Sequence, residues 1–263
     1  MKVDFYLKSK IANILIFLTA VLKKQRSWIF ANSDYQLSGL EEKQIDNFIE
    51  KQNKGIPLAY IVGECGFYHL VFKVNPDVLI PRADTEILID ISLNLFDKDK
   101  GMKILDLGTG SGVIAITLKN KCPKWQVTAT DISQKALTVA KCNADNLAAN
   151  VYFIKSNWFD NLNADKFDLI ISNPPYIAKD DKHLKHLAYE PKNALVSGID
   201  GLDDIRHIIA NANFYLKDGG YLLLEHGYNQ KDAIYNLIKN NFKNVSFYKD
   251  INGIDRAFLG QKM

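Results

Sequence analysis

Cysteine, proline and an excess of one charge are all scarce in this sequence. Only 3 of the 263 residues are Cys, and they are widely spaced without a C-x-x-C pair, which argues against a disulfide framework or a Cys-rich zinc site. With 7 Pro and 15 Gly, the chain is neither collagen-like nor of low complexity. The net charge of only +3 does not indicate a nucleic-acid partner, and it does not exclude one. We expect a globular protein of the reducing cytoplasm.

The N-terminal region also lacks an apolar run long enough to span a bilayer. Residues 11–22 are mostly apolar, but a membrane helix needs ~20 such residues. Lysines precede the run, as they do in signal peptides, yet it contains Asn13 and Thr19 and ends in the basic residues 23–26 without a small-residue cleavage site. We therefore expect a helix buried on most of its surface, and no membrane partner.

Residues 1–65 predict a helical domain. Ile45, Phe48 and Ile49 share one face at helical spacing, and Ser38-Gly39 just before them is a start signal. No residue of this stretch suggests chemistry.

Residues 66–82 carry β-forming side chains and a turn signal at residues 75–77, which predicts a β-hairpin linker between two domains. A helix is expected to begin near Asp84 or Thr85. The third region, residues 83–263, alternates short apolar runs with helical patterns, which predicts an α/β fold with a doubly wound, mostly parallel seven-stranded sheet. The last two runs, 245–251 and 256–262, lack a helix between them and are expected to pair antiparallel.

The first strand of this region ends in a glycine-rich turn. Its residues 108–112 read Gly-Thr-Gly-Ser-Gly, a spacing that differs from the dinucleotide fingerprint and from a Walker loop. Bare backbone and the amides of the following helix allow close approach of a ligand. At the end of the next strand stands Asp131, where a carboxylate can accept hydrogen bonds from both hydroxyls of a ribose. The pair predicts a site for a nucleoside-containing cofactor.

The third strand is followed by Asn157 and Trp158, at the sheet edge where ligands bind in open α/β folds. The Trp158 indole can pack on an adenine and the Asn157 amide can meet the edge of the base. A core tryptophan explains the same fragment, and both interpretations stay open.

The fourth strand stops at Asn173-Pro174-Pro175-Tyr176. The two prolines lack N–H donors and fix φ, so they end the strand in a rigid turn. The Asn173 side-chain carbonyl and the Pro174 backbone carbonyl can both accept from one planar –NH₂ group, on which Tyr176 can stack. The motif predicts a receptor for an amide or amine nitrogen.

These four residues resemble the motif of S-adenosylmethionine-dependent amino-group methyltransferases, and nearly the whole chain resembles the release-factor glutamine methyltransferases. The stretches that carry the likeness are 57–64, 67–82, 104–112, 156–159, 171–177, 222–227 and 253–256. The segment 67–82 is the most specific, because generic methyltransferases lack it. The resemblance implies methyl transfer to the side-chain amide of the glutamine in the Gly-Gly-Gln loop of class I peptide chain release factors, with S-adenosylhomocysteine as the product.

The resemblance also implies roles for individual residues. Catalytic roles fall to Asn173, Pro174 and Tyr176, and substrate contacts to Asn173, Pro174, Pro175 and Tyr176. Cofactor contacts fall to Gly108, Thr109, Gly110, Ser111, Gly112, Asp131, Trp158 and Asn173. The N-terminal domain would recognise the release factor, and we expect a monomer.

Two positions depart from the family pattern. Asn157 stands where the family often has Asp, which removes a charge from the predicted contact with the base. Residues 83–86 read Ala-Asp-Thr-Glu in place of Pro-Glu-Thr-Glu. No metal is expected, because His183 and His186 lack a third ligand nearby.

Two rival functions stay open. In an adenine or guanine methyltransferase, residues 173–176 would bind the amino group of the base in the same way. Such an enzyme would usually need a basic groove or base-flipping apparatus. A non-catalytic cofactor-binding module is the other rival, against which the intact Asn173 and Tyr176 argue.

Overall fold

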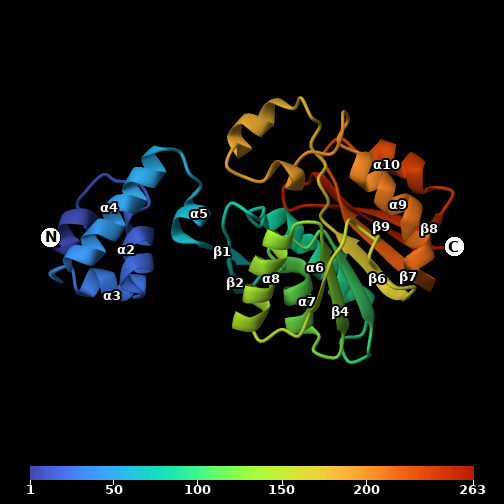
Figure 1. Ribbon diagram of the computed structural model, residues 1–263, viewed down its shortest axis with the longest axis horizontal. Coiled ribbons are helices and arrows are strands. Elements are labelled where there is room, and N and C mark those ends of the chain that lie inside the picture. Colours follow the sequence, from blue (N-terminus) through green and yellow to red (C-terminus); the bar gives the residue numbers. More distant parts are fainter. The chain divides into compact units, whose positions relative to one another are not determined.

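The computed structural model describes residues 1–263, and its internal contacts divide the chain into two compact units, Met1–Glu64 and Cys65–Met263. Figure 1 traces the elements of both units along the sequence.

The first unit is helical, as its sequence predicts. Its core is formed by buried apolar side chains that include Phe17, Leu18 and Ile45. The longest helix starts with a capping box, because the Ser38 side chain accepts from the Glu41 N–H while the Glu41 carboxylate accepts from the Ser38 N–H. No helix of the chain combines the length and apolarity needed to cross a membrane. The helices are α1 (Val3–Leu7), α2 (Ile14–Leu22), α3 (Arg26–Ala31), α4 (Gly39–Asn53) and α5 (Leu58–Val62).

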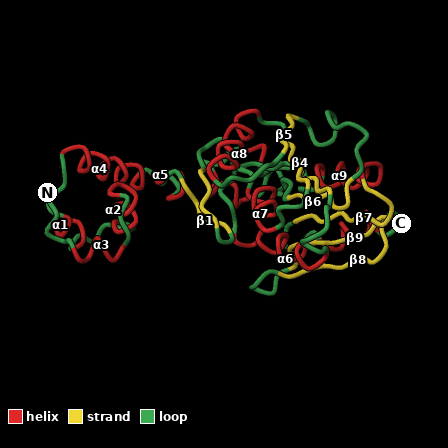
Figure 2. Tube along the Cα trace, turned by 90° about the horizontal axis from the view of Figure 1, so that it is seen from below, coloured by secondary structure: helices red, strands yellow, loops and turns green.

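The second unit is built on a seven-stranded mixed sheet with the order β5-β4-β3-β6-β7-β9-β8, six of whose strands are labelled in Figure 2. Five neighbouring strands are parallel, and β9 runs antiparallel to both β7 and β8. The predicted fold class and the antiparallel final pair are confirmed. The strands are β3 (Lys103–Leu107), β4 (Gln126–Asp131), β5 (Tyr152–Lys155), β6 (Phe167–Ser172), β7 (Leu216–Glu225), β8 (Phe242–Lys249) and β9 (Asp255–Lys262).

Helices cover both faces of this sheet, because alternate strand residues point to opposite sides. Ile104 contributes to a core with α6, α7 and α8, whereas its neighbour Leu105 contributes to a second core with α9 and α10. The helices are α6 (Glu86–Leu95), α7 (Val113–Lys121), α8 (Gln134–Asn146), α9 (Asp203–Tyr215) and α10 (Lys231–Ile238), and short 3₁₀ turns form at η1 (Ala83–Thr85), η2 (Lys182–Leu187) and η3 (Lys192–Ala194).

The predicted hairpin exists, but its turn lies earlier than the sequence suggests. Strands β1 (Glu64–Phe67) and β2 (Leu70–Lys73) are joined at Tyr68, whose φ of 57° is left-handed. The expected turn at residues 75–77 was wrong for the hairpin: it follows β2, where the Asn75 side chain accepts from the Asp77 N–H at 3.0 Å. Phe67 and Phe72 are buried in the core of the second unit, so the hairpin packs on it.

Candidate functional site

The glycine turn after β3 is a left-handed loop at the carboxyl edge of the sheet. Gly108, Gly110 and Gly112 have φ values of 67°, 57° and 86°, a backbone region that residues other than glycine rarely adopt. A Cβ on Gly110 would meet nothing within 4 Å, whereas one on Gly112 would lie 2.7 Å from the Ile116 side chain. Gly110 therefore leaves room for a ligand, and Gly112 allows α7 to pack closely.

Asp106, near the end of β3, fixes the glycine loop by hydrogen bonds. Its Oδ2 accepts from the Thr109 hydroxyl at 2.6 Å and from the Ala115 N–H at 3.3 Å. The side chain is fully buried, and burial raises the pKa of Asp106 to about 7. One carboxyl thus ties the turn to the first turn of α7.

Asp131, at the end of β4, faces the same loop. Its Oδ2 accepts from the Gly110 N–H at 2.9 Å and its Oδ1 from the Ser133 N–H at 2.8 Å. Each carboxylate oxygen has further lone pairs, so the group can still accept from the hydroxyls of a ribose. Burial raises the pKa of Asp131, against the effect of those two amide donors.

Trp158 closes the other side of the glycine loop. Its own φ is 48°, unusual for a bulky residue, and its indole N–H donates to Asp204 Oδ1 at 3.1 Å. A Cβ on Gly108 would lie 3.2 Å from the indole ring, so glycine is needed for this close approach. Beside it, the Asn157 amide donates to Asp160 at 3.1 Å.

The Asn-Pro-Pro-Tyr turn follows β6 directly, and both of its ends are anchored by distant residues. Asn173 Nδ2 donates to Thr85 Oγ1 at 3.0 Å, and the Tyr176 hydroxyl donates to Glu225 Oε1 at 3.1 Å. Burial raises the pKa of Tyr176, and the neighbouring Glu225 raises it further. The turn is fixed by side chains from η1 and from the end of β7.

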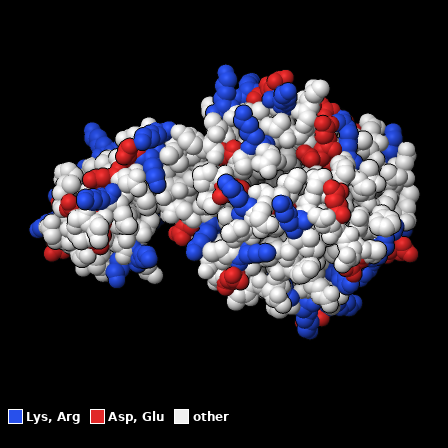
Figure 3. All heavy atoms as spheres, in the orientation of Figure 1, with Lys and Arg blue, Asp and Glu red and all other residues white.

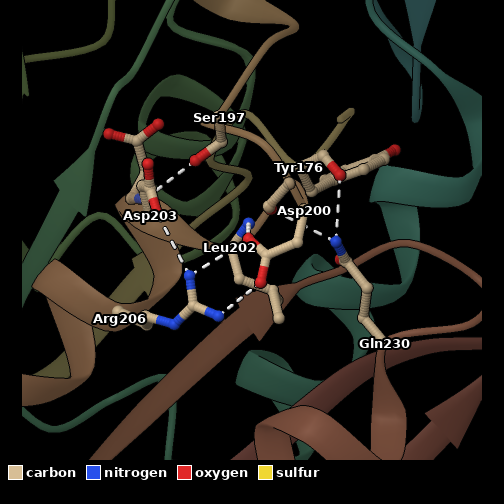
Figure 4. A network of polar contacts seen from close by, with 9 residues as sticks. Tyr176, Ser197, Asp200, Leu202, Asp203, Arg206 and Gln230 are labelled. Atoms are coloured by element: carbon tan, nitrogen blue, oxygen red, sulfur yellow. Dashed lines mark hydrogen bonds and ion pairs between the residues drawn. The ribbon is translucent and has the colours of Figure 1, made fainter. Parts of the chain in front are cut away.

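The Asn-Pro-Pro-Tyr turn is also supported by the loop before α9 and by Gln230 at the start of α10 (Figure 4). Gln230 Nε2 donates to the backbone carbonyls of Tyr176 at 3.0 Å and Gly201 at 3.2 Å. Gly201 has a φ of 79°, and a Cβ there would lie 2.3 Å from the Tyr176 carbonyl oxygen. Arg206 then braces the loop through Asp200 and Asp203, both at 3.0 Å.

An ion pair between a buried carboxylate and a partly exposed arginine joins two further segments at the site. Glu190 accepts from the Ile80 N–H at 3.0 Å and pairs with Arg82. Its carboxylate is 3% exposed, and the segments it joins, around Arg82 and Pro191, both border the cavity described next.

These elements surround a cavity of about 330 Å³ at the carboxyl ends of the parallel strands. Its size falls within the range of ligand pockets, ~300–1,000 Å³. It brings together most of the predicted site residues: Gly108, Thr109, Gly110, Ser111, Asp131, Asn157, Trp158, Asn173 and Pro175.

Three predicted residues do not line this cavity. Gly112 caps α7 and faces Ile116, and Pro174 is buried beneath the turn. Tyr176 packs against the core shared with α9 and α10, with its hydroxyl on Glu225. Direct contact of Pro174 or Tyr176 with a substrate stays a prediction.

Residue-by-residue reasoning gave no role to Asp106, Thr85 or Glu225. Asp106 and Glu225 each stand at or near the carboxyl end of a parallel strand, where ligands bind in this architecture, and that position is the signal that marks them. Thr85 has no such signal, because only the folded chain brings it to Asn173.

Both units of the chain are similar to known protein families. Residues 7–63 match the family described as PrmC N-terminal domain, and residues 85–198 match Methyltransferase small domain. A release factor glutamine methyltransferase of Coxiella burnetii is 40% identical over 94% of this chain and 90% of the relative. One from Buchnera aphidicola (subsp. Schizaphis graminum) is 42% identical over the full length of both chains.

The chain belongs to the release factor glutamine methyltransferase family. Solved structures support the fold of its second unit. A methyltransferase of Pyrococcus furiosus is 23% identical, with a TM-score of 0.55 over 73% of this chain and 88% of that one. The Thermus thermophilus 16S rRNA N2 G1207 methyltransferase, solved with AdoMet and guanosine, is 15% identical, with a TM-score of 0.59 over 76% of this chain and 50% of that one.

Proposed function

We propose that this family member transfers a methyl group from S-adenosylmethionine to the side-chain amide nitrogen of the glutamine in the Gly-Gly-Gln loop of class I peptide chain release factors. The observation that carries the proposal is the likeness to release factor glutamine methyltransferases over 94% or more of the chain, through both units. The cavity of the second unit supplies the parts that this reaction needs.

The residues around the cavity fit S-adenosylmethionine. Gly108 to Ser111 would leave backbone open beside it, Asp131 would accept from the ribose hydroxyls, and Trp158 would pack on the base. When bound, the cofactor supplies a methyl group on a positively charged sulfur, which is already a strong electrophile.

The task left to the protein is alignment of the attacking nitrogen, since an amide nitrogen is a poor nucleophile. In the proposed mechanism the Asn173 Oδ1 and the Pro174 carbonyl accept from the substrate –NH₂ and hold its nitrogen in line. The same two oxygens favour the positive charge that develops on nitrogen. The proton leaves after transfer, when the nitrogen is acidic, so no dedicated base is required.

The Asn173 side chain is prepared for this role. Its nitrogen is engaged by Thr85, which leaves its oxygen as the free end of the amide. Pro175 borders the cavity, and we propose that Tyr176 forms the adjoining wall against the substrate amide.

We also propose that the N-terminal helical domain, residues 1–65, recognises the release factor, and that the hairpin segment 66–82 links it to the methyltransferase domain, residues 83–263. Large apolar side chains are exposed on the helical domain, among them Phe5, Phe30 and Leu40 at 58%, 61% and 77%. A Phe30→Ser variant is expected to raise the KM for release factor and to leave kcat unchanged; an unchanged KM would remove Phe30 from the interface.

We propose that the protein is cytoplasmic and monomeric. The molar mass in solution, measured by light scattering, would check the oligomeric state.

The alternative, methylation of a nucleobase, has less support. The net charge is only +3, and on the face drawn in Figure 3 Lys and Arg side chains are interspersed with Asp and Glu. Such a distribution differs from the basic stripe typical of nucleic-acid binders.

The deciding experiment offers the chain labelled S-adenosylmethionine with three acceptors: release factor, release factor whose loop glutamine is changed to glutamate, and total RNA. Label is expected only in the first. Transfer to RNA, or equal transfer to both release factors, would contradict the proposed substrate.

A further inference from the structure

The side-chain amide of Asn173 is held in one orientation by Thr85. Asn173 Nδ2 donates to Thr85 Oγ1 at 3.0 Å, across 88 positions of the sequence. Thr85 is 2% exposed and ends the short turn η1, so its hydroxyl has little freedom. Only the oxygen of a carboxamide can accept from a substrate –NH₂. The proposed role of Asn173 therefore depends on which end of its amide Thr85 engages.

A hydroxyl can donate as well as accept, so Thr85 alone does not fix this choice. The neighbouring Glu225 carboxylate does, because its Oε2 is buried without a hydrogen-bond partner and it interacts with the Thr85 side chain. The Thr85 hydroxyl has one proton, and an ionised carboxylate can only accept. When that proton points to Glu225, the lone pairs of Thr85 face Asn173 and select its NH₂ end.

Glu225 also holds the other end of the Asn-Pro-Pro-Tyr turn. Its Oε1 accepts from the Tyr176 hydroxyl at 3.1 Å, and its Oε2 is buried without a hydrogen-bond partner of its own. The carboxylate is fully buried at the end of β7. One carboxylate thus acts on Asn173 through Thr85 and on Tyr176 directly.

We propose that Thr85 and Glu225 are positioning residues: a directed hydrogen-bond relay from Asn173 through Thr85 to Glu225 turns the Asn173 oxygen toward the substrate amide and steadies Tyr176. The inference rests on the proposed function, since it explains how that function's carboxamide acceptor is set. Neither residue needs to touch the reacting atoms.

The charges around Glu225 give the relay a pH dependence. Burial, with a smaller contribution from Asp84, raises the pKa of Glu225 to about 7 against the lowering effects of Thr85, Tyr176 and Arg256. The Arg256 guanidinium is shared with Asp84 at 3.3 Å and Asp250 at 3.0 Å. Below its pKa, Glu225 gains a proton and can donate to Thr85, so the direction of the relay is lost. Turnover should therefore fall as pH falls through about 7.

Thr85→Val and Thr85→Ser separate the hydroxyl from the shape of the residue. Thr85→Val keeps the shape and removes the hydroxyl, and with it the hydrogen bond from Asn173 and the proposed one to Glu225. It is expected to lower kcat about tenfold or more, a loss typical of removing an outer partner that orients a functional ligand. The KM for release factor and the affinity for S-adenosylhomocysteine should change little. Thr85→Ser, which retains the hydroxyl, should restore most of kcat.

Thr117→Val is the matched control. Thr117 is fully buried in α7, and its hydroxyl has no hydrogen-bond partner. The same change of atoms there removes no relay, so kcat should equal that of the wild type. A loss as large as that of Thr85→Val would mean that any buried Thr→Val change lowers turnover, which would overturn the inference.

Glu225→Gln tests the direction of the relay. It should lower kcat and remove the fall in activity below about pH 7, because the carboxamide does not titrate in this range. The inference is overturned if Thr85→Val matches the wild type, if Thr85→Ser is no better than Thr85→Val, or if the pH profile survives in Glu225→Gln. If Glu225→Gln fails to fold, the Thr85 pair still decides. A wild type that does not methylate release factor would instead overturn the proposed function.

Discussion

The two halves of the cavity are assembled in different ways. Most of the cofactor half is made by residues close together in sequence: Thr109 bonds to Asp106 three positions away, and Gly110 to Asp131 at 21 positions, whereas Trp158 is held by Asp204 across 46 positions. The substrate half is held by distant partners, with Asn173 bonded to Thr85 at 88 positions and Tyr176 to Glu225 at 49. One strand–turn–helix unit and its neighbour therefore define the glycine loop and Asp131, whereas the substrate half exists only once the whole unit is folded.

This difference predicts that the two halves can be damaged separately. Changes in the substrate half should lower turnover, and changes in the cofactor half should lower cofactor affinity.

The largest effect is expected from Asn173→Ala. It removes an acceptor aimed at the charge that develops on nitrogen, and comparable losses lower kcat roughly 10²–10³-fold. Cofactor affinity by calorimetry should stay near that of the wild type. Asn236→Ala, an exposed change on α10, should alter neither quantity. Retention of full turnover in Asn173→Ala would remove this residue from the mechanism.

Asp131→Asn should produce the converse result. It replaces a charged acceptor that faces the proposed ribose site, and hydrogen bonds to charged groups contribute about 1.5–3 kcal/mol. The Kd for S-adenosylmethionine is expected to rise about ten- to a hundredfold, with kcat at saturating cofactor close to that of the wild type. An unchanged Kd would mean that Asp131 serves only the loop amides of Gly110 and Ser133.

Gly201→Ala tests the support behind the substrate half. A Cβ there would lie 2.3 Å from the Tyr176 carbonyl oxygen, and the φ of 79° adds backbone strain. The cost of such strain is about 1–3 kcal/mol, and we expect a lower Tm together with a lower kcat. Gly253→Ala is the control, since Gly253 has the same φ of 79° but nothing within 4 Å of the added Cβ. Equal losses in both variants would assign the whole effect to backbone strain.

The smallest effect should be one that the two halves share. Burial raises the pKa of Asp106 in one half and of Glu225 in the other to about 7. Because both values are raised above those of the unfolded chain, the folded state binds these two protons more readily. The stability that this protonation contributes is therefore lost as pH rises through about 7. Urea unfolding at several pH values should show this decline, with a smaller slope in Asp106→Asn. A slope that is unchanged in the variant would contradict the assignment to Asp106.

Much of the fold follows from local pattern. The alternation of apolar runs and helical patterns predicted the sheet, because strand and helix periods are properties of short segments. The sequence places the hairpin turn wrongly. Asn75-Pro76-Asp77 does form a turn, but it follows β2. The turn that joins β1 and β2 uses Tyr68, a residue without turn preference.

The candidate site divides in the same way. The glycine loop and Asp131 could be paired from the sequence, because the spacing of adjacent parallel strands brings them together. Thr85 and Glu225 could not be assigned to Asn173 and Tyr176, because no local rule predicts contacts across 88 and 49 positions. Such contacts come from the order of the strands and from the folded position of η1 beside the turn that follows β6.

The most direct test is a crystal structure of the protein with S-adenosylhomocysteine and a peptide that contains the Gly-Gly-Gln loop. We predict that the glutamine amide nitrogen lies within hydrogen-bond distance of Asn173 Oδ1, with Asn173 Nδ2 still on Thr85. A glutamine amide bound elsewhere in the cavity, or an Asn173 side chain turned away from Thr85, would contradict the account.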